Sequence, residues 1–146
     1  MITDSYDFLT TTKKNRFIFE SEGVQGKIIK IVLFTPLENS EWNLGFGDLI
    51  KGEINDSIVS NNQDVFMVMK TIAKIITVFL QEYPKSIIVI KPVDEKRKRL
   101  YNGIFHRHFN DIEPLFDLKG IIKNEKEPYL PKKNYDSFEI TLKFEL

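Results

Sequence analysis

Basic residues are concentrated in one short stretch of the chain, "VDEKRKRLYNGIFHRHFNDI" (residues 93–112). Residues 96–99 read Lys-Arg-Lys-Arg, and Tyr101 follows close behind them. Cationic side chains hydrogen-bond phosphate and other anions, and an aromatic ring adds a surface on which a ligand can stack. The apolar residues of the stretch have helical spacing and Asp94 is a suitable N-cap, so the basic residues fall in the first turn of a predicted helix.

The position of these charges within the predicted helix is unusual. The helix dipole disfavours cations in the first turn by about 0.3–1 kcal/mol, whereas the free backbone N–H groups there favour a bound anion. We therefore predict an anion or phosphate site formed by Lys96, Arg97, Arg99 and Tyr101. Two alternatives stay open: an ordinary solvated helix face with Arg97 paired to a carboxylate on the sheet, or a surface that binds a protein partner.

Acidic residues recur in "GDLIKGEINDSIVSNNQD" (residues 47–64). Asp48, Asp56 and Asp64, with Glu53 nearby, are possible partners of the basic turn, or could hold a divalent cation. Their spacing matches neither an EF-hand loop nor a recognisable nuclease signature. Loop and capping chemistry is the alternative interpretation.

The sequence indicates no metal site and no cofactor. His106 and His108 are two positions apart on a predicted helix, so they face different directions and cannot chelate one ion. We expect one of them to be exposed and the other to lie against the core. The chain contains no cysteine, and no Gly-rich phosphate loop, GxSxG or HExxH motif.

The elements that position these residues follow from hydrophobic periodicity. An antiparallel meander of three strands is followed by a mostly buried helix capped by Asn61 or Asn62, then a strand, the basic helix and one or two further strands. The segment "KNEKEPYLPKK" is expected to be a polar loop. The fold class is α+β, with an antiparallel-dominated sheet wrapped on two helices in the order βββαβαβ(β). The predicted strands are residues 15–21, 26–37, 40–49, 86–91, 118–124 and 135–146, and the predicted helices are residues 64–83 and 94–112.

Composition bounds the class of protein. The chain has 146 residues, of which 42% are hydrophobic, and its formal net charge is zero. We expect one globular domain over residues 1–146, in which residues 1–14 could be loosely ordered. No overall charge attracts the chain to nucleic acid or to a membrane. No signal peptide or membrane-spanning stretch is recognisable, so a cytoplasmic location is expected.

Several stretches carry a resemblance to a known family: residues 17–34, residues 47–84, "RKRLY" (residues 97–101) and residues 135–144. The sequence resembles an uncharacterised family of small Bacteroidota proteins of about this length. In that family a Gly-Ser-Thr turn precedes Arg-x-Arg-Leu-Tyr, and Arg97, Arg99, Leu100 and Tyr101 match the second part. Here "KPVD" replaces the small hydroxyl residues. The resemblance implies no activity.

Three functions are compatible with these residues. The first is a non-catalytic binding module whose basic turn takes a phosphate-bearing ligand or nucleic acid. The second is a metal-dependent, nuclease-like or phosphoryl-handling enzyme of a toxin or phage-defence type. The third is an interaction module that binds a protein encoded by a neighbouring gene.

Overall fold

The strands form one mixed sheet in the computed structural model, which describes residues 5–55 and 62–143. The order is β1-β2-β3-β4-β6-β9-β7-β8, and β5 pairs with β4 beside this path. The expected α+β class and the order of the long elements are confirmed. The strands are β1 (Phe8–Thr10), β2 (Arg16–Gly23), β3 (Gly26–Pro36), β4 (Glu41–Ile50), β5 (Glu53–Asn55), β6 (Ile87–Ile90), β7 (Phe116–Ile122), β8 (Glu125–Pro128) and β9 (Ser137–Leu142).

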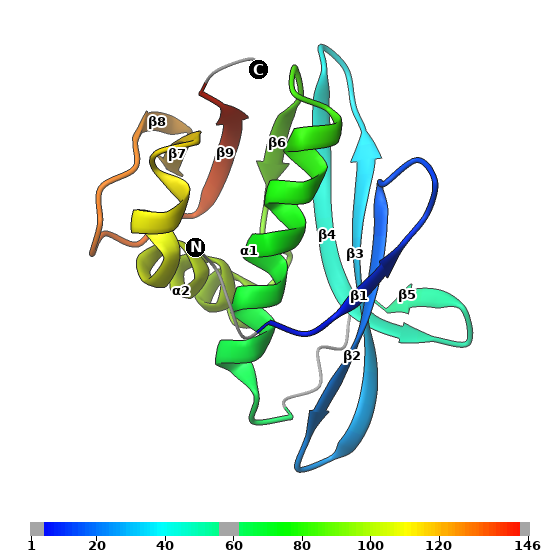
Figure 1. Cartoon of the computed structure of the whole chain (residues 1–146). Coiled ribbons are helices and arrows are strands. Elements are labelled where there is room, and N and C mark those ends of the chain that lie inside the picture. Colours follow the sequence, from blue (N-terminus) through cyan, green and yellow to red (C-terminus); the bar gives the residue numbers. More distant parts are fainter. Residues whose placement is uncertain (1–4, 56–61, 144–146) are drawn as a thin grey trace.

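Strands β2, β3 and β4 form the expected antiparallel meander. Side chains alternate between the two faces, so that Phe17, Val32 and Phe46 are cross-strand neighbours on one face and are all buried. This inner face packs against the helix α1 (Val65–Glu82), where the rings of Phe34 and Phe79 stack with centroids 3.9 Å apart. Figure 1 shows α1 in front of the sheet, with β1–β5 on one side of it and β7–β9 on the other.

A short parallel seam joins the meander to the second half of the sheet. Residues 41–43 of β4 pair with residues 87–89 of β6, and β4 then continues to Ile50 beyond the last of these pairs. On its other side β6 is antiparallel to β9. The second helix, α2 (Glu95–Ile112), follows β6, so its first turn lies where β4 and β6 part.

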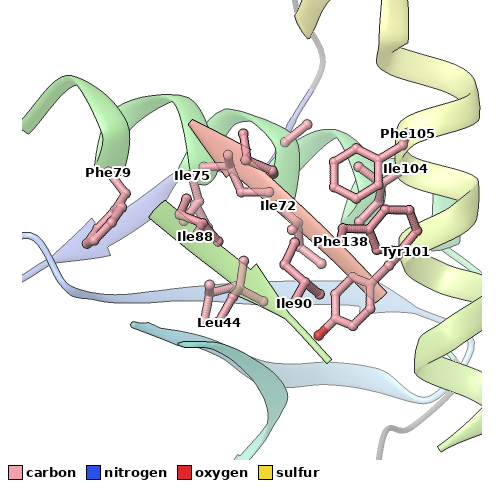
Figure 2. Packing of buried hydrophobic residues seen from close by; sticks show 14 of the residues in the cluster. Leu44, Ile72, Ile75, Phe79, Ile88, Ile90, Tyr101, Ile104, Phe105 and Phe138 are labelled. Carbon is pink, nitrogen blue, oxygen red and sulfur yellow. The ribbon is translucent and has the colours of Figure 1, made fainter. Parts of the chain in front are cut away.

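Both helices contribute to one apolar core. Figure 2 shows Ile72 and Ile75 of α1, Ile104 and Phe105 of α2, and strand residues such as Ile88 in the same cluster. Among the described residues, no helix is long and apolar enough to cross a membrane.

The predicted N-cap residue is correct for α2 and wrong for α1. The side chain of Asp94 caps α2 as expected and accepts a hydrogen bond from the backbone N–H of Arg97. The cap of α1 is Asp64 rather than Asn61 or Asn62, and its side chain makes no capping hydrogen bond. Asn61 lies outside the described residues. The side chain of Asn62 instead binds the β2–β3 turn, where it accepts from the N–H of Gln25 and donates to the carbonyl of Gly26.

Three short strands were not expected. β1 extends the meander within the first 14 residues, and β5 folds back on β4. The prediction of a polar loop over residues 123–133 is wrong for its first part, because β8 pairs there with β7. β8 reads Glu-Lys-Glu-Pro and forms an edge, where solvated charged side chains are tolerated and a hydrophobic pattern is absent.

Candidate anion-binding site

A pocket of about 310 Å³ opens where the first turns of both helices meet β3 and β4. Three of the four residues predicted to bind an anion, Lys96, Arg97 and Arg99, line this pocket. One of the three predicted acidic partners, Asp64, lines it too. The basic turn and part of the acidic segment therefore share one cavity. The lining residues are Lys30, Phe46, Asn62, Asp64, Val65, Val68, Met69, Lys96, Arg97, Arg99 and Leu100.

Arg97 is hydrogen-bonded to β4 at the point where β4 and β6 diverge. Its Nε atom donates to the carbonyl oxygen of Phe46 at 2.7 Å, at a position of β4 beyond the β6 seam. Its Nη1 atom donates to Oδ2 of Asp94 at 2.5 Å. The side chain is only 2% exposed, so the guanidinium fills buried space. The two hydrogen bonds fix its position.

Asp94 offsets the unfavourable placement of cations at the helix start. One of its carboxylate oxygens accepts from the backbone N–H of Arg97 at 2.8 Å, and the other accepts from the Arg97 guanidinium. A carboxylate at this position also interacts favourably with the helix dipole. The cap thus allows a buried cation within the first turn.

Two of the other three basic residues of the turn line the pocket, and the third does not. Lys96 and Arg99 are exposed residues on the wall of the pocket. Lys98 instead pairs with Asp136 at 2.8 Å, and it is not a lining residue. The hydrogen bond from Lys98 lowers the pKa of the Asp136 carboxyl. The four basic residues of the predicted cluster therefore have three different roles. Arg97 is buried, Lys96 and Arg99 are exposed on the pocket wall, and Lys98 forms a surface ion pair.

Tyr101, the fourth residue predicted to bind an anion, does not line this pocket. It is 2% exposed and belongs to the apolar core, where Figure 2 labels it together with Ile90 and Phe138. Tyr101 and Arg97 both line a second pocket of about 170 Å³, together with residues of β3 and β4. In this position the Tyr101 ring packs in the core rather than beside Lys96 and Arg99.

A buried ion pair adds a cation that the sequence analysis did not identify. Lys30 and Asp48 are paired neighbours on β3 and β4, and Lys30 Nζ lies 2.5 Å from Asp48 Oδ1. Both side chains are nearly inaccessible to solvent, at 2% and 4% exposed. Lys30 also lines the pocket. A signal was present in the sequence: Lys30 has the same strand parity as Val32 and Phe34, which predicts an inward-pointing side chain.

Asp64, at the N-terminus of α1, is hydrogen-bonded to β2 and to the segment before β1. Its Oδ2 atom accepts from Ser21 Oγ at 2.5 Å and from the Tyr6 hydroxyl at 2.6 Å. Burial, and then the hydrogen bond to Asp64, raise the pKa of the Tyr6 hydroxyl. The carboxylate is therefore occupied by two protein donors on one oxygen. Asp56, the remaining predicted acidic residue, lies outside the described residues.

The two histidines differ as predicted, with one exposed and one buried. His106 is exposed, and its Nε2 atom lies 3.0 Å from the carbonyl oxygen of Lys133. His108 is 7% exposed, and burial lowers its pKa. Within residues 5–55 and 62–143, no group of three His, Cys, Asp or Glu side chains is arranged to hold a metal ion.

Cations and carboxylates lie together around the pocket. Four cations line it, namely Lys30 and the three basic residues of the helix turn. Three carboxylates oppose them: Asp64 in the lining, Asp48 on Lys30 and Asp94 on Arg97.

These features define an α+β protein with a cationic pocket at the meeting point of its helix starts. The chain matches the model of a family described as "Family of unknown function (DUF6934)" over residues 3–143, and it belongs to that family. No curated protein and no solved structure matches the chain.

Proposed function

We propose that this chain is a small bacterial cytoplasmic binding protein, related to the Bacteroidota family that its sequence resembles, and that its pocket takes a small phosphate-bearing ligand. Lys96, Arg97 and Arg99 contact the anionic group, and Lys30 contributes from the floor. The observation that carries the proposal is the convergence of these four cations on one cavity at the start of α2. Basic side chains that converge on one cavity bind an anion through charge-assisted hydrogen bonds.

The arrangement supports binding more than catalysis. Arg97 is already fixed by Phe46 and Asp94, so it can present its charge without reorganising. The carboxylates Asp48 and Asp64 each accept a hydrogen bond from a protein donor at 2.5 Å. Such carboxylates are poorly suited to hold a divalent cation. The alternative, a metal-dependent nuclease-like or phosphoryl-handling enzyme that uses Asp48, Asp56 and Asp64, draws less support from this geometry.

A small ligand fits the site better than a nucleic acid strand or a protein partner. Nucleic acid binding without sequence preference uses open grooves with exposed aromatic rings, whereas Tyr101 is buried here. A concave pocket of this size is typical of small-molecule sites.

Titration with methyl phosphate at low ionic strength tests the proposal. We expect saturable binding by calorimetry or by NMR shifts of α2 amides, and weaker binding as salt is raised. Lys96→Ala and Arg99→Ala should each lower the affinity about three- to tenfold. Lys98→Ala is the matched control, because this lysine belongs to the same turn but pairs with Asp136.

Two outcomes would overturn the proposal. One is the absence of binding at low ionic strength. The other is an equal loss of affinity for Lys98→Ala and Arg99→Ala, since this would indicate attraction to the general charge of the helix rather than to the pocket.

A further inference from the structure

The wall of the pocket is divided into a cationic part and an apolar part. The cations come from β3 and from the first turn of α2. The apolar side chains come mainly from the first turns of α1 and face the same cavity. Val65 is 43% exposed and Met69 is 8% exposed, so the apolar surface extends from the rim into the interior. The apolar lining residues are Phe46, Val65, Val68, Met69 and Leu100.

This division is informative because a site for a bare inorganic anion needs no apolar wall. Inorganic phosphate is hydrated on all sides, and apolar surface beside it gives no favourable contact. Apolar surface that remains in contact with water is instead stabilised when a hydrocarbon group covers it. The lining therefore favours a ligand with two chemically different ends.

We infer that the ligand is an organic anion with one anionic group and an apolar body, such as an alkyl or aryl phosphate or carboxylate. This inference rests on the proposed function and narrows it to a chemical class. The head lies against Lys96, Arg97 and Arg99, and the body covers Val68, Met69 and Leu100.

The size of the cavity limits the apolar body. A volume of about 310 Å³ is at the lower end of the range for pockets that bind organic ligands. A phosphate with a chain of four to six carbons is a small ligand of that class. Longer chains extend beyond the cavity into water, where an added methylene gives little affinity.

A homologous series of ligands tests the inference on the full chain. The probes are inorganic phosphate and the methyl, butyl, hexyl and decyl phosphates, all at one ionic strength and below their micelle concentrations. We expect affinity to rise by up to about fourfold per methylene from methyl to butyl. The rise should end near hexyl. Butyrate and hexanoate form a parallel arm that distinguishes a phosphate head from a carboxylate head, and butanol and hexanol are the uncharged controls.

Substitutions of equal shape separate the apolar wall from the fold. Val68→Thr makes the wall more polar and should reduce the gain from methyl to butyl phosphate about threefold, with little effect on methyl phosphate. Val78→Thr is the matched control, since Val78 is a half-buried valine of α1 outside the pocket lining. Val65→Thr at the exposed rim supplies a second variant in case Val68→Thr lowers the stability of the fold.

The results distinguish this inference from the proposed function. Equal affinity for inorganic, methyl and butyl phosphate would overturn the inference but leave an anion-binding pocket. Equal affinity for butanol and butyl phosphate would instead overturn the proposed function, because the cations would then contribute nothing. If no member of the series binds, both are wrong.

Discussion

The guanidinium of Arg97 donates from Nε to the carbonyl oxygen of Phe46 at 2.7 Å, although the two residues lie 51 positions apart in the chain. Phe46 belongs to the part of β4 that extends past the seam with β6. The arginine thus supplies a hydrogen bond at a place where the sheet parts. It is a structural residue as well as a wall of the pocket.

Arg97→Ala should destabilise the protein by about 2–4 kcal/mol, because it leaves a buried carbonyl without this donor and opens a cavity. Arg99→Ala should change the free energy of unfolding by less than about 0.5 kcal/mol, since its side chain is exposed. Urea unfolding followed by circular dichroism measures both values. Similar values for the two variants would contradict the structural role of Arg97 as a buried hydrogen-bond donor.

Substitutions of Lys30 and Asp48 should have strongly non-additive effects on the free energy of unfolding. Lys30→Met or Asp48→Leu alone leaves a buried charge without its partner and should cost about 3–5 kcal/mol. The double variant removes both charges and should be more stable than either single variant. Chemical unfolding of all four proteins gives the coupling energy. Additive losses would show that the pair is not a unit.

His108 predicts a dependence of stability on pH. Burial holds the pKa of the folded imidazole below its ordinary value of about 6.5, against the opposing pull of Asp111 and with Arg107 and Lys70 adding to the effect. The unfolded chain therefore binds more protons as the pH falls below about 6.5, and stability is lost until the folded pKa is passed. Above that range the neutral ring has no such penalty.

His108→Gln should flatten this slope between pH 7.5 and 5. The free energy of unfolding, measured by urea at several pH values, should then change less with pH for the variant than for the parent protein. NMR titration of the ring checks the cause directly. A pKa at or above the ordinary value in the folded protein would contradict the prediction.

Two buried glycine contacts predict different effects of alanine on stability. A Cβ atom at Gly120 would lie 2.3 Å from the Tyr135 ring, which is fully buried and cannot move aside. A Cβ at Gly103 would meet the terminal Cε of Met69 at 2.4 Å, and that end of a methionine is flexible. We expect Gly120→Ala to cost about 1–3 kcal/mol. Gly103→Ala should leave stability nearly unchanged, because helix propensity improves by about 1 kcal/mol.

Gly103→Ala should also affect the pocket, since Met69 is part of its lining. Displacement of the Met69 side chain should lower the affinity for hexyl phosphate more than that for methyl phosphate. Thermal unfolding and ligand titration of the same sample give both readouts. A large loss of stability with unchanged selectivity would contradict the predicted displacement.

Asp64→Asn should strengthen anion binding about two- to fivefold at low salt, because it removes a negative charge from the pocket wall. It should also cost about 1–2 kcal/mol of stability, since the hydrogen bonds from Ser21 and Tyr6 lose a charged acceptor. Calorimetry with methyl phosphate measures the first effect. Weaker binding, or binding that requires a divalent cation, would favour the enzyme alternative instead.

The sequence predicts the regular parts of this fold because periodicity and caps are local. The bounds of α2 follow from the Asp94 cap and the helical spacing after it, and the meander follows from strand alternation. The parallel seam between β4 and β6 could not be predicted, since it depends on how two distant strands meet. The strand β8 was missed because edge pairing does not require a hydrophobic pattern.

The candidate site was predictable only in part, for a related reason. The basic turn indicates cations but not their directions, and only the folded chain separates Lys98 from Lys96 and Arg99. Tyr101 appears beside them in the sequence, yet it packs in the core and does not line the pocket. Lys30 could have been found, because a lysine at an inward position of a strand requires a partner charge.

The place of β9 between β6 and β7 affects how the chain is completed during synthesis. A ribosome releases the meander and both helices before residues 137–142 emerge. Until then, β6 has strand pairs only with β4, at three positions, and its other edge has no strand beside it. Such unpaired apolar edges are where growing chains aggregate or bind chaperones. On its arrival β9 pairs with β6 and β7 at once, so this pairing also removes two edges at which the nascent chain could aggregate.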